Sequence, residues 1–107
     1  SPEQIRGLPL DQRADVYSFG CTAYEMVTGK RPYTGVSANE LLMKHIKAAP
    51  PTAEATNSNV TPEFALLLQR SIAKKPEDRP ESMTKWLAEF KSIRVFKETP
   101  KPPGNEE

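Results

Sequence analysis

The stretch from Asp11 to Gly29 constrains the fold more than any other part of the sequence. Between residues 14 and 27 it carries only two charges, those of Asp15 and Glu25. On a helix of 3.6 residues per turn, the apolar residues of this stretch cover nearly every side. A helix that is apolar nearly all round packs against neighbours on every side, so we predict a buried central helix. Asp11 is its predicted N-cap, and Gly29 is the residue predicted to end it.

Four further segments have the start and stop signals of helices, which are capping serines or threonines, early prolines and terminating glycines or prolines. The predicted helices are one turn at about residues 2–6, and longer helices at about 37–48, 61–72 and 82–93. Residues 8–10 are expected to form an extended link, and residues 49–60 a polar loop. No segment alternates well enough to be a strand. The predicted fold class is all-α, with about four main helices.

The composition limits the classes of partner. Fifteen basic residues against fourteen acidic ones give no electrostatic reason to expect nucleic acid or a membrane surface as a partner. No apolar run reaches the roughly 18 residues of a membrane-spanning helix. The single cysteine, Cys21, excludes an internal disulfide and cannot alone form a zinc site. We expect it to be a buried, reduced thiol, which fits a cytoplasmic location.

The two ends of the chain differ in character from its middle. It opens with Ser-Pro-Glu, without an initiator methionine or a leader, so we expect it to be a piece of a longer protein. It closes with a stretch rich in proline, lysine and glutamate that cannot bury a core. We therefore predict a folded unit over residues 1–95 and a disordered tail over residues 96–107.

Four motifs stand in a fixed order along the chain. They are Ser-Pro-Glu at residues 1–3, Asp-Val-Tyr-Ser-Phe-Gly at 15–20, Gly-Lys-Arg-Pro-Tyr at 29–33 and Pro-Glu-Asp-Arg-Pro at 76–80. Together they resemble the distal half of the large lobe of a protein kinase, from the Ala-Pro-Glu motif to the last helix. Ser1 stands where that family usually has alanine. The opening is most similar to serine/threonine kinases of the bacterial, eukaryotic-like type. An unrelated helical bundle would require the four motifs to be in register by coincidence.

The resemblance implies a parent enzyme that uses ATP and Mg²⁺ to phosphorylate hydroxyl side chains of proteins. Its glycine-rich loop, strand lysine, His-Arg-Asp catalytic loop and Asp-Phe-Gly metal ligand would all lie upstream of the Ala-Pro-Glu motif. This chain then holds no catalytic, nucleotide-binding or metal-binding residue, and alone it is expected to be inactive. Its expected partners are the missing N-terminal lobe and catalytic loop, and protein substrates or regulators. A pseudokinase or protein-docking module without phosphotransfer stays open, because such a protein can keep this half intact.

The resemblance assigns supporting roles to five residues. Asp15 matches the helix aspartate whose carboxylate accepts hydrogen bonds from the catalytic loop; the alternative is an acid that only complements the helix dipole. Thr22 and Met26 match positions that anchor a stack of apolar side chains below the adenine pocket, although an aliphatic residue is usual in place of Thr22. Glu3 and Arg79 match an ion pair between the end of the activation segment and the loop before the last helix. The alternative for that pair is two solvated surface charges.

The predicted helix at residues 37–48 resembles the kinase helix that protrudes from the lobe and often docks substrates or regulators. Leu41, Leu42 and Ile46 form either an exposed docking face or an inward-packing one. His45 is the only histidine, and it is expected on the surface or half-buried, because the sequence offers no partners for a metal or catalytic role. Four nearby basic residues either attract acidic partners or form a solvated face: Lys30, Arg31, Lys44 and Lys47.

Overall fold

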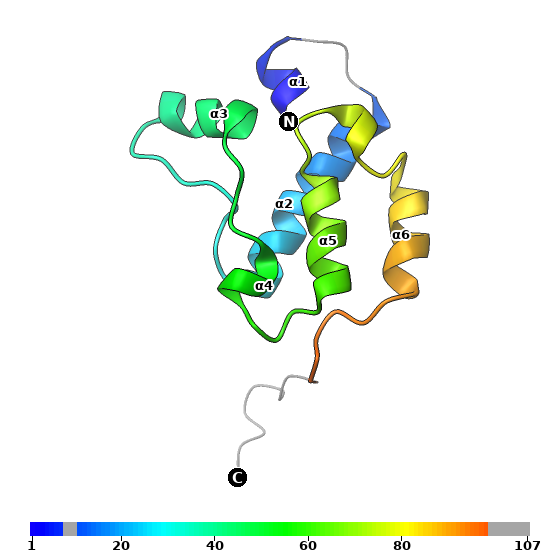
Figure 1. Ribbon diagram of the computed structural model, residues 1–107. Coiled ribbons are helices and arrows are strands. Elements are labelled where there is room, and N and C mark those ends of the chain that lie inside the picture. The colour runs from blue at the N-terminus through cyan, green and yellow to red at the C-terminus, as the bar shows by residue number, and fades with distance from the viewer. Residues whose placement is uncertain (8–10, 99–107) are drawn as a thin grey trace.

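The computed structural model describes residues 1–7 and 11–98. The helices follow in the order α1 (Pro2–Ile5), α2 (Gln12–Thr28), α3 (Ala38–Lys47), α4 (Ala53–Thr56), α5 (Pro62–Ser71), the 3-10 turn η1 (Pro76–Asp78) and α6 (Met83–Lys91) (Figure 1). These residues form no β-sheet, so the predicted all-α class is confirmed. None of the helices in the described ranges is long and apolar enough to cross a membrane.

Each of the four long helices begins at a side chain that caps it. The Asp11 carboxylate accepts a hydrogen bond from the first turn of α2 at 2.8 Å. Ser37, Thr61 and Ser82 cap α3, α5 and α6 in the same way, each accepting from the backbone three residues later. The helix α2 ends at Gly29, whose φ of 74° lies in the left-handed region that glycine adopts at little cost. The predicted bounds of the central helix are confirmed.

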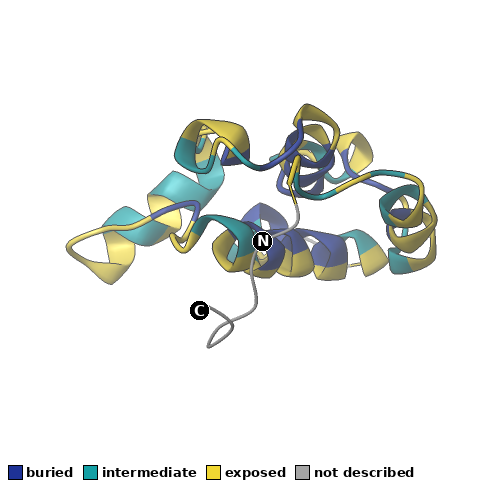
Figure 2. Ribbon diagram, turned by 90° about the horizontal axis from the view of Figure 1, so that it is seen from below, coloured by how far each residue is buried: buried dark blue, intermediate teal, exposed yellow. Residues whose placement is uncertain are grey.

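The core lies where α2 packs along α5, with α4 and α6 beside them (Figure 1). Its buried side chains are Val16, Ala23, Tyr24, Ala53, Val60, Phe64, Ala65, Leu67, Leu68 and Trp86. The two central helices lie close together at Gly20, where an added β-carbon would lie 2.7 Å from the Cβ of Ser71. Figure 2 shows buried residues concentrated on the central helices, while the outer elements are largely exposed.

The prediction that α2 has neighbours on every side is wrong. Phe19 is 41% exposed and Met26 is 79% exposed, and Thr22 between them is also exposed. An apolar helix face indicates that other residues pack against it, but it does not show that those residues belong to the same segment. Cys21 is half-buried rather than buried, and its burial raises the pKa of the thiol.

The segment from 49 to 60 also differs from the prediction, because it contains α4 rather than only a polar loop. The hydroxyl of Thr52 caps this helix by accepting a hydrogen bond from the backbone N–H of Ala55 at 3.3 Å. Ala53 and Val60 are buried in the core. A four-residue helix is too short to show an apolar period, so periodicity did not reveal it.

The described chain continues past residue 95, where we placed the end of the folded unit. Phe96 forms an isolated antiparallel bridge with Val60 and packs against the core. The backbone N–H of Lys97 donates to the carbonyl of Asn59 at 2.7 Å. Residues 96–98 are therefore paired with the rest of the chain, contrary to the predicted start of the tail. The remainder of that tail, and the predicted link at residues 8–10, lie outside the described residues.

Candidate functional site

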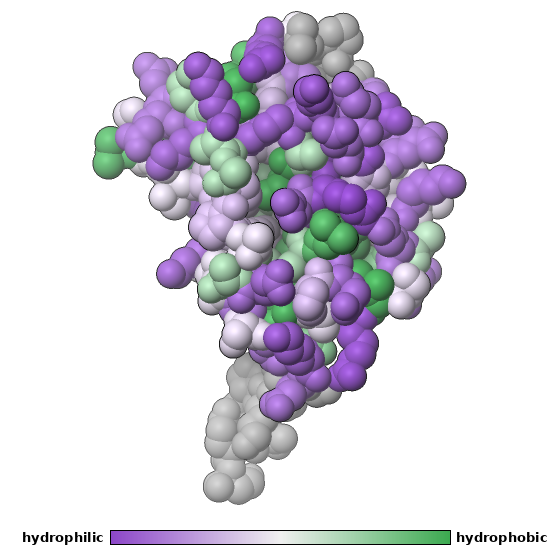
Figure 3. Space-filling model, in the orientation of Figure 1, coloured by the Kyte–Doolittle hydropathy of each residue, from purple (hydrophilic) through white to green (hydrophobic). Residues whose placement is uncertain are grey.

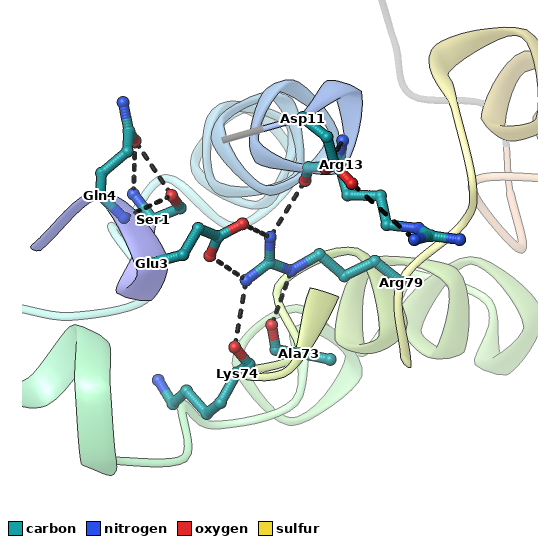
Figure 4. A network of polar contacts seen from close by, with 8 residues as sticks. All are labelled: Ser1, Glu3, Gln4, Asp11, Arg13, Ala73, Lys74 and Arg79. Carbon is teal, nitrogen blue, oxygen red and sulfur yellow. Dashed lines mark hydrogen bonds and ion pairs between the residues drawn. The ribbon is translucent and has the colours of Figure 1, made fainter. Parts of the chain in front are cut away.

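Glu3 on α1 and Arg79, which follows η1, meet in the interior although 76 residues separate them (Figure 4). Arg79 Nη1 donates to Glu3 Oε2 at 2.7 Å, and Nη2 donates to Oε1 at 2.9 Å. The exposed fraction is 0% for the arginine side chain and 5% for the glutamate side chain. Two parallel N–H···O bonds make a bidentate pair, which fixes the orientation of both groups.

The other hydrogen-bonding capacity of Arg79 goes to backbone carbonyls (Figure 4). Its Nε–H donates to the carbonyl of Ala73 at 2.8 Å, and its two Nη atoms also donate to those of Arg13 and Lys74 at 3.1 and 3.2 Å. The guanidinium lies 4.7 Å from the centre of the Tyr17 ring, in cation–π geometry. One side chain therefore ties α1, the start of α2 and the loop after α5 together.

This environment explains the charge state of the pair. Hydrogen bonds from Arg79 hold the pKa of the Glu3 carboxyl below its ordinary value. Arginine suits the position because its planar fork presents five N–H donors, whereas a lysine ammonium presents three from a single point. Removing one partner of such a pair leaves a buried charge without compensation, which is strongly destabilising.

A second feature is the open stripe of α2, which we define as Asp15, Phe19, Thr22 and Met26. These side chains are three or four residues apart and therefore share one face of the helix. All four are exposed. The Thr22 hydroxyl donates back to the carbonyl of Ser18 at 3.2 Å, so its polar group is satisfied within the helix. Among the described residues, no hydrogen bond or ion pair reaches the Asp15 carboxylate.

The open stripe adjoins an apolar groove of about 230 Å³ between α2, α5 and α6. The Phe19 ring meets Trp86 edge to face at 4.8 Å, and Trp86 stacks on Phe90 at 5.1 Å. Trp86 Nε1 donates to the Ser71 hydroxyl at 2.9 Å, which satisfies its only donor. Leu87 completes the exposed part of the groove. By contrast, Figure 3 shows a face that is mostly hydrophilic, with small hydrophobic spots.

The helix α3 does not bury any residue fully. Of the predicted docking residues, Leu42 is exposed, whereas Leu41 and Ile46 are half-buried, so the three do not form one exposed face. The exposed apolar residues here are Val36, which is 97% exposed, and Met43, together with Leu42. Val36 and Met43 were not among the predicted docking residues, because neither falls on a clear apolar period.

Hydrogen bonds of two tyrosine hydroxyls, those of Tyr17 and Tyr33, anchor α3 to the core. The Tyr17 hydroxyl lies 2.7 Å from Nδ1 of His45, which is half-buried. The Tyr33 hydroxyl donates to the carbonyl of Ala48 at 2.9 Å and accepts from Lys74 Nζ at 2.5 Å. Burial lowers the pKa of His45, and it lowers the pKa of Lys74 to about 8. No sequence signal predicted this cluster, because its members come from four separate segments.

Two observations concern metal ions and phosphate groups. In residues 1–7 and 11–98, no group of three or more His, Cys, Asp or Glu side chains is arranged to hold a metal ion. The glycine of the Asp-Val-Tyr-Ser-Phe-Gly motif, Gly20, faces Ser71 and Ile72 of the neighbouring helix. It serves close helix packing and does not cradle a phosphate.

Comparison with known proteins decides the family. The family model described as protein tyrosine and serine/threonine kinase matches residues 1–88. The chain belongs to the protein kinase family. This kinase segment is 37% identical over 94 residues to the probable serine/threonine-protein kinase CA_C1728 of Clostridium acetobutylicum, with 88% of the chain covered. It is 37% identical over 95 residues to the serine/threonine-protein kinase PknB of Mycolicibacterium smegmatis, with 89% covered.

The kinase segment is also 35% identical over 100 residues to PknB of Mycobacterium tuberculosis, with 94% of the chain covered. It spans only 14%, 15% and 16% of the lengths of these three relatives. The predicted resemblance to the C-terminal part of the large lobe of bacterial-type serine/threonine kinases is confirmed. The roles assigned to Asp15, Thr22 and Met26 stay predictions.

Proposed function

We propose that this segment is the supporting part of an active serine/threonine protein kinase, which uses ATP and Mg²⁺ to phosphorylate protein hydroxyl groups. The segment does no chemistry itself. It supports the catalytic loop and the substrate side of the enzyme. The observation that carries the proposal is the open stripe of α2. The residues that the family resemblance assigns to contacts with the rest of the lobe are the ones that this segment leaves exposed.

Asp15 is suited to hold a loop through its backbone amides. It lies in the first turn of α2, where the helix dipole favours the charged form of a carboxylate. A charged carboxylate is a strong acceptor for backbone N–H groups. Phe19, Met26 and the adjoining groove offer apolar surface, and each Å² of it that the rest of the kinase covers would contribute roughly 25 cal/mol of stabilisation. Polar anchoring and apolar burial thus occur on the same stripe.

The Glu3–Arg79 pair supports the other side of the proposal. It fixes α1 against the start of α2 and the loop after α5. In the proposed enzyme α1 closes the activation segment, so the pair sets where the substrate-binding stretch ends.

Protein substrates or regulators are the proposed partners, with Val36, Leu42 and Met43 as the apolar docking residues around α3. Because ATP is the phosphoryl donor, the proposed location of this domain is the cytoplasm.

The test is Asp15→Ala in the complete protein, with turnover measured on a protein substrate. We expect turnover to fall by about a hundredfold, because a small misplacement of catalytic groups has an effect of that size. Glu63→Ala is the matched control, since Glu63 is also an exposed acid in the first turn of a helix. A folded Asp15→Ala protein with wild-type turnover would reduce Asp15 to an ordinary helix acid and remove the main support for the proposal.

A second measurement concerns the 107-residue chain alone. Calorimetric titration with Mg-ATP is expected to show no saturable binding, and assays to show no phosphate transfer. Saturable micromolar binding would contradict the assignment of all nucleotide contacts to the missing part of the enzyme.

A further inference from the structure

A cationic cavity of about 470 Å³ lies between the loop after α2 and the end of α3. Three of its lining residues are basic, namely Lys30, Arg31 and Lys44, and none is acidic. Its apolar lining, which we call the floor, is contributed by Tyr24, Pro32, Tyr33, Ala48, Ala49 and Pro51. The cavity belongs neither to the Glu3–Arg79 pair nor to the open stripe of α2.

Two of the three cations are available to a ligand. Arg31 is 70% exposed, and its nearest carboxylate oxygen, on Glu25, lies 3.8 Å away, so this surface ion pair is weak. Lys30 is exposed and pairs with no acid within the described part of the chain. Lys44 is already engaged: it donates to the carbonyl of Thr34 at 2.5 Å and lies 3.4 Å from a Glu40 oxygen.

The turn that carries these two cations is fixed by its own hydrogen bonds. Thr28 Oγ1 accepts from the backbone N–H of Lys30 at 3.1 Å and lies 2.8 Å from its carbonyl oxygen. Pro32, which follows Arg31, restricts the backbone further and is buried. The cations therefore project from an ordered turn, which lowers the entropic cost of binding.

The floor of the cavity presents apolar surface. Tyr24 and Tyr33 are buried, and their hydroxyls already donate to the carbonyls of Pro51 and Ala48 at 2.6 and 2.9 Å. Lys74 and His45 also pack on the Tyr33 ring, so the apolar surface left to contact a ligand is that of the exposed residues Ala49 and Pro51. Apolar walls beside a charge keep the local dielectric low, which strengthens attraction to an anion. A cationic rim over an apolar floor suits a ligand that combines an anionic group with carbon.

We propose that this cavity binds a phosphorylated side chain of a protein. The Arg31 guanidinium takes two phosphate oxygens, the Lys30 ammonium adds a point charge, and flanking peptide residues cover the apolar floor at Ala49 and Pro51. A phosphoryl ester carries about −1.5 to −2 charges at neutral pH, which matches two available cations. The inference rests on the proposed function, because a protein kinase generates such esters on its products and on itself.

The test measures fluorescence anisotropy of labelled peptides with the complete protein, in EDTA and without nucleotide. The probes are a degenerate nine-residue peptide library with a central phosphoserine and the same library with serine. We expect the phosphorylated library to bind about tenfold more tightly or better. Lys30→Ala/Arg31→Ala should remove that preference, because charge-assisted hydrogen bonds of this kind each contribute a tenfold effect or more.

The matched control is Lys85→Ala/Lys91→Ala, which removes two exposed lysines of α6 outside the cavity. Retained binding in this control supports the site, whereas an equal loss would show general charge attraction and overturn it. Displacement of the peptide by inorganic phosphate with equal affinity would also overturn it, because the floor would then contribute nothing. Phosphotransfer is assayed separately: an inactive protein that still binds through Lys30 and Arg31 contradicts the proposed function and leaves the site standing.

Discussion

The two sides of α2 differ in what covers them. On the side that faces α5, Val16 is fully buried and Gly20 lies so close to Ser71 that an added β-carbon would force the helices to shift. On the open stripe, Met26 is 79% exposed and Phe19, beside Trp86, is 41% exposed. The closed side accounts for the stability of this segment. We propose that the open side is a surface that another part of the protein covers.

Glu3 and Asp15, two acidic residues near the start of the chain, repeat the contrast. Glu3 is buried, and Arg79 satisfies it through two hydrogen bonds. Asp15 lies in the first turn of α2 and is exposed. Glu3 is paired within the segment, so its removal should lower the free energy of unfolding. Asp15 is exposed, so its removal should lower the activity of the complete protein. The following predictions test this division.

Arg79→Ala should have the largest effect on the free energy of unfolding. It leaves the Glu3 carboxylate buried without a counter-charge and removes the donors to three backbone carbonyls. Breaking a buried pair in this way typically costs ~3–5 kcal/mol, a large share of the ~5–15 kcal/mol that stabilises a domain. Denaturant unfolding of Arg79→Ala, Glu3→Ala and the double variant measures it, and the double should be clearly less than additive.

Arg70→Ala is the control for that experiment, because Arg70 pairs with Glu89 while both side chains are about 40% exposed. A pair of this kind contributes only ~0–1 kcal/mol. If Arg79→Ala lost no more stability than Arg70→Ala, the closed side of the molecule would not depend on the ion pair.

Gly20→Ala should destabilise the closed side by a smaller amount. The new β-carbon would lie 2.7 Å from the Cβ of Ser71 and 3.0 Å from a methyl carbon of Ile72, so α2 and α5 must separate. Overpacking of this kind costs ~1–3 kcal/mol, partly offset by the ~1 kcal/mol gain in helix propensity. Ser18→Ala, two residues earlier and exposed, is the control and should leave the unfolding midpoint unchanged. A stabilised Gly20→Ala variant would contradict the close packing.

The helix boundaries were predictable from sequence because capping is local. Asp11, Ser37, Thr61 and Ser82 each act on backbone groups within three residues, so the signal and the structure lie in the same few positions. The family motifs likewise brought Glu3 and Arg79 to attention, although 76 residues separate them.

Contacts between helices were not predictable in the same way. The Tyr17–His45 and Trp86–Ser71 hydrogen bonds depend on how separate helices pack, which no single window of sequence records. The exposure of Met26 was missed for a related reason. An apolar period shows which face of a helix is to be buried, and it carries no information about which chain segment buries it.

Acidification should weaken the closed side through Glu3. Because hydrogen bonds from Arg79 lower the pKa of this carboxyl in the folded state, its stabilising contribution is fully present above the ordinary value of 4.5. The contribution is lost as the pH falls through the lowered pKa. The difference in unfolding free energy between wild type and Glu3→Gln should therefore shrink below about pH 4.5. A difference that stayed constant down to pH 3 would show that the charge of Glu3 is not what stabilises the pair.

Met26→Ala should have the smallest effect on the unfolding free energy of the 107-residue chain and a large effect on that of the complete protein. Because Met26 is 79% exposed, its truncation should change the unfolding free energy of the 107-residue chain by less than about 0.5 kcal/mol. In the complete protein the same truncation should cost ~2–5 kcal/mol, the usual range for methionine in a core. Leu66→Ala is the control, since Leu66 is an exposed apolar residue of α5 outside both the open stripe and its groove, and it should have a small effect in both proteins. If Met26→Ala had an equally small effect in the complete protein, the open stripe would be ordinary solvent-exposed surface, and the distinction between the two sides of α2 would lose its functional meaning.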